Sequence, residues 1–173
     1  MMHATPARTT HVMQGQTQVS QDPNEVLTSI LGSCVAACVR DPERRIGGMN
    51  HFLLPGSDPR DSGNVRYGAK SMEDLINALL RRGADRRRLE VWLFGGANVL
   101  GTQTGVGAAN SAFAMEFVKT EGFTLRGSDL GGTLGRRIRF TPFKGTAQVA
   151  LMQKAPIEKP IARKPSGPDI ELF

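Results

Sequence analysis

The chain has 173 residues, of which 39% are apolar, 22% charged and 6% aromatic. These proportions are typical of one soluble globular domain whose core needs neither a disulfide nor a structural metal. The longest uninterrupted apolar run, Cys34 to Val39, spans six residues and is too short for a membrane span or a secretory signal. We therefore expect a cytoplasmic protein that does not insert into a membrane.

The net charge of +6 comes from 22 Lys and Arg residues against 16 Asp and Glu residues. The basic residues are dispersed, and the one dense run, residues 86–88, follows the predicted end of a helix. Nucleic-acid binding also favours aromatic side chains that stack on bases, and the chain has one Trp and one Tyr. We expect no nucleic-acid partner and interpret the charge as a solvated face or a docking surface for an acidic partner.

Apolar periodicity predicts strands and helices that alternate unevenly along the chain. Residues 11–20 alternate well enough for an edge strand, and a helix begins at Ser71, which forms a capping pattern with Asp74, and ends at Gly83. Several strands are separated only by turns, which indicates an α+β fold with a mixed or antiparallel sheet and helices packed outside it. The predicted strands cover residues 26–31, 35–40, 46–54, 89–94, 123–126, 137–141 and 146–152, and the predicted helices cover 71–82 and 108–120.

The two ends of the chain lack the pattern of a packed core. Residues 1–13 are predicted to be a flexible N-terminal segment, residues 14–153 the folded domain, and residues 154–173 a proline-rich tail. The last residues of the tail are apolar, so its tip is available to dock on this domain or on a partner. We expect truncation after Gln153 to leave folding nearly unchanged, because the prolines prevent the tail from adding a central strand.

Residues 31–55 form the segment most informative about chemistry. Asp-Pro suits the first two positions of a type I turn at residues 41–44. A turn centred directly after Pro42 pairs residues whose numbers add up to 85, which sets Cys34 opposite His51. Directly opposed residues have Cβ atoms about 4.5–5.5 Å apart, so the hairpin predicts a thiol facing a base, the minimum nucleophilic pair.

Neighbouring residues supply the other parts of such a site. Gly32 and Ser33 allow a sharp turn that leaves free N–H groups beside the sulfur of Cys34, where an oxyanion would develop. His51 is the only histidine outside the N-terminal segment. A third group must orient the imidazole, and Thr28 on the preceding strand is one candidate, through its hydroxyl or its carbonyl.

A structural role is the alternative for each of these residues. Free cysteine is among the most buried residue types, so Cys34 alone suits a core position, and a lone histidine in a strand is usually structural. For Cys38, predicted to lie opposite Gly47, we favour the core role.

Metal and nucleotide sites are not indicated. His3 and His11 are eight residues apart without a further cluster of ligands, so we expect no metal site. Gly95 and Gly96 lack the spacing of a phosphate-binding loop and more simply serve a tight turn.

Five motifs follow one another along the chain. They are TSILGSCVAACVRDP, IGGMNHFLLP, FGGANVLG, VGAANSAFAMEFVKTEGF and SDLGGTLGRRIRFTPFKGTAQV. In this order, over about residues 14–152, they resemble the chemoreceptor glutamine deamidases, the CheD family. Family members often have Arg where this chain has Ala109, before Asn110, so surface recognition near that helix is expected to differ.

The resemblance implies a fold, a site and an activity. The fold is a β-sandwich with flanking helices, related to bacterial deamidating toxins. Cys34 corresponds to the nucleophile, His51 to its base and Thr28 to the orienting residue, and no cofactor is required. The implied partners are methyl-accepting chemotaxis receptors and, where an organism has it, the phosphatase CheC.

The implied reaction hydrolyses the side-chain amide of specific receptor glutamines to glutamate, with ammonia release through a thioester on Cys34. A cysteine peptidase or a transglutaminase would use the same thiol and base. A non-catalytic binding module that regulates a phosphatase or a receptor would need no thiolate. These alternatives remain open at the level of sequence.

Overall fold

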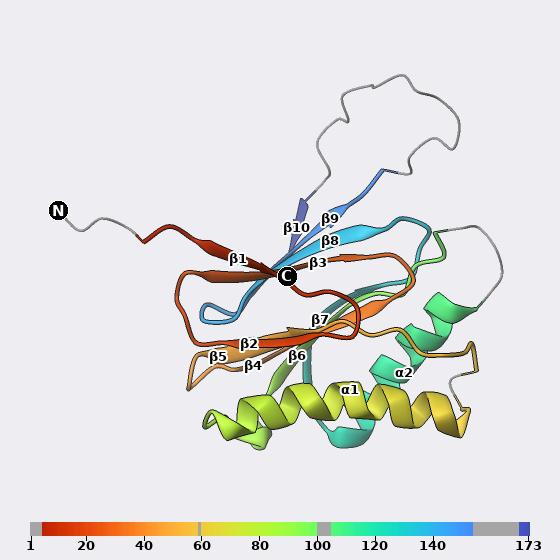
Figure 1. Cartoon of the computed structure of the whole chain (residues 1–173), viewed down its shortest axis with the longest axis horizontal. Coiled ribbons are helices and arrows are strands. Elements are labelled where there is room, and N and C mark those ends of the chain that lie inside the picture. Colours follow the sequence, from red (N-terminus) through yellow and green to blue (C-terminus); the bar gives the residue numbers. More distant parts are fainter. Residues whose placement is uncertain (1–4, 59, 100–104, 154–169) are drawn as a thin grey trace.

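The structure is a computed structural model and describes residues 5–58, 60–99, 105–153 and 170–173. Two five-stranded sheets pack face to face, and the two α-helices of the described residues cover the outer face of one sheet (Figure 1). The predicted α+β class, a mixed β-sandwich flanked by helices, is therefore confirmed. Neither of these helices is both long and apolar enough to cross a membrane.

Both sheets are mixed, because each contains one parallel pair, β1 with β3 and β6 with β7, among antiparallel neighbours. In spatial order the first sheet consists of β1 (Arg8–His11), β3 (Glu25–Leu31), β8 (Arg136–Thr141), β9 (Thr146–Leu151) and β10 (Ile170–Leu172). The second consists of β2 (Thr17–Ser20), β5 (Ile46–Asn50), β4 (Val35–Asp41), β6 (Glu90–Gly95) and β7 (Thr124–Leu130). The helices are α1 (Ser62–Arg81) and α2 (Val106–Glu121), with a short 3₁₀ helix at Arg86–Arg88.

Strand β4 is at the centre of the second sheet and is buried on both faces. Val35, Ala37 and Val39 pack toward the helices, whereas Ala36 and Cys38 pack between the sheets. Burial on both faces explains why this strand is a continuous apolar run instead of an alternating one. The prediction that Cys38 is a core residue is confirmed, since its side chain is fully buried.

Helix α1 begins at Ser62, so the predicted start at Ser71 is wrong. Asp61 is the capping residue, and its Oδ1 accepts hydrogen bonds from the N–H groups of Gly63 and Asn64 at 2.9 and 3.2 Å. Glycine and asparagine are weak helix formers, and their presence in the first turn hides this start in the sequence. The cap and the packing of the helix against β5 and β2 outweigh the low local propensity.

The β4–β5 hairpin has a different register from the one predicted. Asp41 lies opposite Ile46, Cys38 opposite Met49, and Val35 opposite Phe52, so paired residue numbers add up to 87. The predicted sum of 85 is therefore wrong, as is the pairing of Cys38 with Gly47. The loop contains four residues, 42–45, instead of the two that the turn template assumed.

Asp41 explains the longer loop. Its buried carboxylate accepts hydrogen bonds from the N–H groups of Glu43 and Arg44 at 3.0 and 3.3 Å. The same group accepts from the Asp85 N–H at 2.9 Å and from the Arg88 guanidinium at 2.8 Å. Burial raises the pKa of Asp41, but these donors outweigh burial and hold the pKa at about 2. A turn prediction that considers only the residues of the turn cannot take account of hydrogen-bond donors that lie so far away in the sequence.

The domain boundaries also differ from prediction at both ends. The expected flexible segment, residues 1–13, is wrong from Arg8 onward, because β1 pairs with β3 and Val12 is buried in the core. Residues 8–12 are ordered through their pairing with β3, a strand that comes later in the sequence, so their local pattern does not predict it. At the other end, β10 pairs with β9, while the proline-rich residues 154–169 lie outside the described residues.

We expect removal of residues 170–173 to lower the melting temperature by roughly 2–4 °C for each kcal/mol of stability lost, contrary to the expectation from sequence. The deletion removes the β9–β10 pairing and the contact of Phe173 with Phe94, whose ring centroids are 5.7 Å apart. Phe173→Ala, which removes the ring alone, should show about half of the loss. An unchanged melting temperature in the deletion variant would contradict the pairing of β10.

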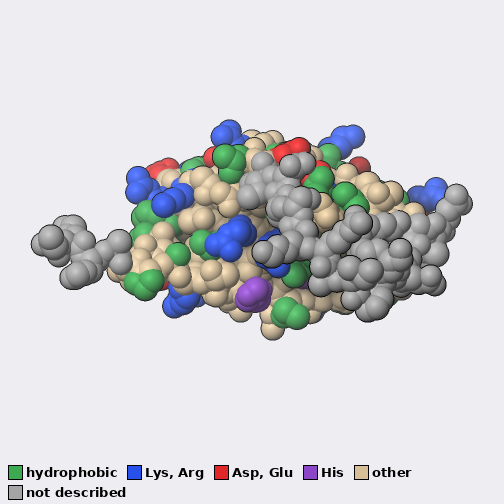
Figure 2. Space-filling view, turned by 90° about the horizontal axis from the view of Figure 1, so that it is seen from above, with side chains coloured by type: hydrophobic (Ala, Val, Ile, Leu, Met, Phe, Trp, Pro, Cys, Tyr) green, Lys and Arg blue, Asp and Glu red, His purple; other side chains and the backbone are tan. Residues whose placement is uncertain are grey.

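The densest basic run, Arg86–Arg88, is engaged in ion pairs. Arg86 contacts Glu121 at 2.7 Å and Arg88 contacts Asp41 at 2.8 Å. Figure 2 shows one face of the molecule, on which Lys and Arg side chains lie at separate places, without forming a continuous stripe. These contacts support the interpretation of the charge as dispersed and largely solvated.

Candidate active site

Cys34 lies in a bend between β3 and β4, where three successive carbonyl groups are held in place. The N–H groups of residues 96 and 97 donate to the carbonyls of Cys34 and Gly32 at 2.8 and 2.9 Å. The side chain of Asn110, on α2, donates to the Ser33 carbonyl at 2.7 Å. The path of the chain on either side of the thiol is therefore determined by hydrogen bonds to these three main-chain carbonyls.

The N–H groups of the same bend are open. Within the described residues, the N–H groups of Ser33 and Cys34 donate to no main-chain acceptor. Burial raises the pKa of the Cys34 thiol, and the residue's own N–H, close to the sulfur, offsets only part of the rise. The thiol is half-buried, and its Sγ lies 3.7 Å from Gln14 Oε1. Open N–H groups beside a partly accessible thiol are the arrangement that stabilises an oxyanion.

His51 directly follows β5, and its side chain is 7% exposed. Its Nδ1 lies 2.8 Å from Ser29 Oγ and 3.1 Å from the Val12 carbonyl, to which Ser29 also donates. Since that carbonyl can only accept, the network assigns the proton of the neutral imidazole to Nδ1 and leaves Nε2 as the base. Burial lowers the pKa of His51, and the Val12 carbonyl offsets part of that shift.

The observed register places Cys34 and His51 on the same face of the hairpin but not directly opposite each other. Because Val35 lies opposite Phe52, His51 is level with Ala36, and Cys34 is its diagonal neighbour. Diagonal neighbours are about 7–8 Å apart at the backbone, within reach of long side chains. In the described residues no hydrogen bond joins the thiol to the imidazole: the thiol contacts Gln14, and the imidazole contacts Ser29 and Val12.

Comparison with known proteins gives the family. A family model described as CheD chemotactic sensory transduction matches residues 53–151. A protein of Jannaschia sp. (strain CCS1), named "Probable chemoreceptor glutamine deamidase CheD", is 69% identical over 164 residues, which cover 95% of this chain and 94% of that protein. The chain belongs to the CheD family.

Two further relatives carry the same name. A Rhizobium leguminosarum protein is 49% identical and covers 97% of this chain and 94% of its own length. An Agrobacterium fabrum protein is 46% identical, and the comparison covers 100% of both chains. The second comparison also spans the residues before position 53, which the CheD family model does not match.

Thr28 does not have the contacts predicted for an orienting residue. Its hydroxyl donates to the Ile138 carbonyl at 2.8 Å, and its own carbonyl accepts from the Val12 N–H at 2.8 Å. Neighbouring residues of a strand point to opposite faces, so Ser29, one position later, brings its hydroxyl to His51. For the contact with the imidazole, Ser29 replaces Thr28.

Gly32 and the Gly95–Gly96 pair differ in why glycine is suitable. The backbone of Gly32 does not have a positive φ, and a Cβ there would meet only Val99, at 3.5 Å. The sharp turn predicted at Gly32 therefore does not require glycine. Gly95, with φ of 113°, leaves no room for a Cβ, which would lie 2.1 Å from the Cys34 carbonyl. The predicted role of the Gly95–Gly96 pair in a tight turn agrees with this geometry, and the turn lies against the bend that carries Cys34.

Sequence reasoning missed three residues of this site. Gln14 and Ser29 are polar residues of ordinary strand or turn segments, and no pattern distinguishes them. Asn110 did leave a signal, because it is a polar residue among the apolar positions of the predicted helix, and the structure buries it fully. A buried amide needs hydrogen-bond partners, and here they belong to the segments that precede β4 and follow β5.

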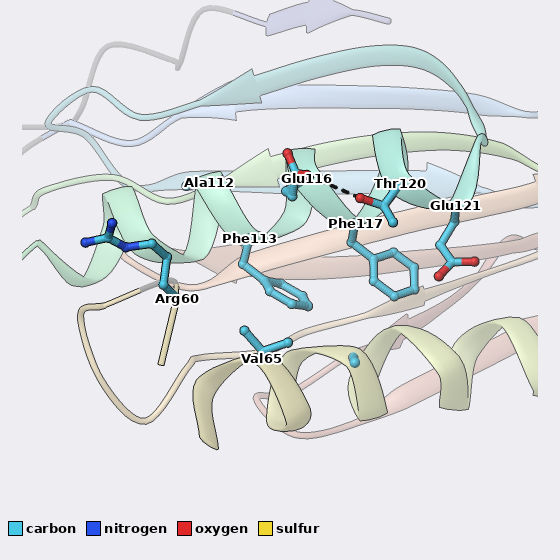
Figure 3. A pocket seen from close by; sticks show the side chains of 9 residues that line it. Arg60, Val65, Ala112, Phe113, Glu116, Phe117, Thr120 and Glu121 are labelled. Carbon is cyan, nitrogen blue, oxygen red and sulfur yellow. Dashed lines mark hydrogen bonds between the residues drawn. The ribbon is translucent and has the colours of Figure 1, made fainter. Parts of the chain in front are cut away.

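A separate groove of about 610 Å³ lies between α1 and α2 (Figure 3), the helices that cover the outer face of the second sheet. It has an apolar floor and a polar rim. The floor consists of Val65, Ala69, Ala112, Phe113 and Phe117, and the rim of Arg60, Glu116, Thr120 and Glu121. This groove contains no thiol or histidine and is not part of the candidate CheD active site.

Proposed function

We propose that this chain is a chemoreceptor glutamine deamidase, which hydrolyses receptor glutamine side chains to glutamate through a thioester on Cys34. The proposal rests on one observation above the others. The half-buried thiol of Cys34 lies beside open N–H groups and on the same hairpin face as His51, whose Nε2 is free to act as a base. The name shared by relatives of up to 69% identity supports the same activity.

The first half of the reaction forms the thioester. The Cys34 sulfur attacks the carboxamide carbon as its proton passes to His51 Nε2, and the carbonyl oxygen becomes an oxyanion beside the N–H groups of Ser33 and Cys34. His51 then gives this proton to the departing nitrogen. The C–N bond breaks and ammonia leaves.

The second half restores the enzyme. Water attacks the thioester carbon and loses a proton to His51, and the same N–H groups stabilise the second oxyanion. The C–S bond breaks, and the proton returns to the Cys34 sulfur. The product is a glutamic acid side chain, which releases its remaining proton to solvent and so adds a negative charge to the receptor.

The resting protein favours a neutral pair. Burial raises the pKa of the Cys34 thiol and lowers the pKa of His51, so both shifts disfavour a preformed thiolate–imidazolium pair. The proton therefore moves during the attack, and His51 acts as a general base. This differs from the many cysteine nucleophiles that rest as thiolates.

The substrate is proposed to be a protein, because a free glutamine offers too little surface to orient itself in a half-open bend. Methyl-accepting chemotaxis receptors are the proposed substrates, in agreement with the name of the relatives. The phosphatase CheC stays a predicted partner on the resemblance alone. A reduced thiol is required, so we place the reaction in the cytoplasm.

The experiment that tests this function incubates the purified protein with a chemoreceptor from the same genome and measures each receptor peptide by mass spectrometry. We expect gains of about 1 Da at particular glutamines, with ammonia release and no chain cleavage. Cleavage of the receptor would indicate a peptidase, and attachment of an added amine would indicate a transglutaminase. An unmodified receptor that still binds would favour the non-catalytic module.

We expect Ser29→Ala to lower the rate constant kcat for deamidation by roughly tenfold, the equivalent of one lost hydrogen bond of about 1.4 kcal/mol. The variant leaves Nδ1 of His51 with the Val12 carbonyl alone, so the imidazole is held less firmly. Thr28→Val is the matched control, because it removes the hydroxyl that donates to Ile138. A larger kcat loss in Thr28→Val than in Ser29→Ala would return the orienting role to Thr28.

A further inference from the structure

Asn110 joins the segments that carry the two proposed reacting groups. Its side chain is fully buried on α2. The Nδ2 donates to the Ser33 carbonyl at 2.7 Å, one residue before Cys34, and the Oδ1 accepts from the Leu54 N–H at 2.9 Å, three residues after His51. Both partners are main-chain atoms, so the contacts constrain the backbone and not the neighbouring side chains.

The contact with Ser33 determines the direction of one particular N–H group. The Ser33 carbonyl and the Cys34 N–H belong to the same planar trans peptide unit, in which C=O and N–H point in opposite directions. When Asn110 holds this carbonyl toward α2, the Cys34 N–H must point away from α2. That N–H belongs to the same residue as the sulfur and, among the described residues, donates to no main-chain acceptor.

The carbonyls on either side are held separately. Ala97 N–H donates to the Gly32 carbonyl and Gly96 N–H to the Cys34 carbonyl. Only the peptide unit between Ser33 and Cys34 depends on a side chain for its orientation. A peptide unit that is free to rotate would lose the fixed donor direction on which oxyanion stabilisation depends.

We propose that Asn110 is a positioning residue, which aims the Cys34 N–H at the oxyanion by holding the Ser33 carbonyl. The inference rests on the proposed function, since it requires an oxyanion at Cys34. Asn110 itself does not touch the substrate. It acts through the peptide unit that precedes the nucleophile.

The test replaces Asn110 by aspartate in the full chain. Asn110→Asp keeps an acceptor for Leu54 but puts an oxygen against the Ser33 carbonyl, so the peptide unit is no longer held. The matched control is Asn64→Asp, because Asn64 is also buried and its Nδ2 donates to the Asp58 carbonyl at the same distance, 2.7 Å. Deamidation of the receptor and alkylation of Cys34 by iodoacetamide are measured for each variant, below its melting temperature.

We expect Asn110→Asp to lower kcat by about 100-fold, the loss typical of one oxyanion donor. The KM and the alkylation rate should change by less than about threefold, because neither depends on an oxyanion. Asn64→Asp should keep the kcat of the unchanged protein. If Asn110→Asp does not fold, Asn110→Ala is the second variant, with the same expected pattern.

Three results would overturn the inference. They are a kcat within about threefold of the unchanged protein, a loss of alkylation equal to the loss of kcat, and an equal kcat loss in Asn64→Asp. The second would mean that Asn110 positions the sulfur, and the third would mean that any lost buried amide has this effect. Failure of the proposed function is distinguishable, because in that case the unchanged protein does not deamidate or Cys34→Ala stays active.

Discussion

Cys34→Ala is expected to abolish the deamidation of receptor glutamines while the protein stays folded. The variant removes the only group in the bend that can form the thioester, and the cost in stability is modest because the thiol is half-buried and small. The measurement is the mass of receptor peptides after incubation, together with the melting temperature of the variant.

Cys38→Ala is the matched control for this prediction. Cys38 is a thiol of the same chain, but it is fully buried, and burial raises its pKa well above the ordinary cysteine value. Its replacement should retain activity. Equal loss in both variants would favour a core or redox role for the two thiols, and activity in Cys34→Ala would remove the assignment of the nucleophile.

His51→Asn is expected to lower kcat by about 10²–10⁴-fold, the usual contribution of a general base. In the unchanged protein, activity should fall as the pH falls through the pKa of His51, because protonation of Nε2 removes the base. Burial lowers that pKa, so the midpoint of the acid limb should lie below the ordinary histidine value of about 6.5.

The alkylation of Cys34 by iodoacetamide supplies the second half of this test. Burial raises the thiol pKa. The alkylation rate should therefore still increase as the pH rises above about 8.5, the ordinary pKa of cysteine. The step that protonation of His51 causes in the pH profile of activity should be absent from the pH profile of alkylation. A midpoint of activity above 6.5, or a fully formed thiolate at neutral pH, would show instead that Cys34 and His51 rest as an ion pair.

The sequence was sufficient for the class of fold and for the face of the hairpin that carries the chemistry. Strands and helices follow from periodicity, and Cys34 and His51 share a face in both the predicted and the observed register, because the two registers differ by an even number of residues. A shift of one residue would have separated them. The even shift is why the two residues still share a face although the predicted turn was wrong.

What the sequence could not provide depends on contacts between distant segments. The four-residue loop requires Arg88, and the order of residues 8–12 requires β3. Glycine is a weak helix former, yet Gly68 lies within α1, where a Cβ would lie 2.5 Å from the Phe113 ring, so the residue permits close contact between α1 and α2. Local propensity contains no information about such neighbours.

The buried carboxylate at the end of the hairpin has a consequence for the proposed chemistry at the other end of β4. Asp41 and its donors hold one register of the two strands, and a slip by two residues would change a diagonal thiol and imidazole into directly opposed groups. The carboxylate loses its charge only near pH 2. Across the neutral range Asp41 therefore keeps its charge and its donors, so its hold on the hairpin register does not change with pH.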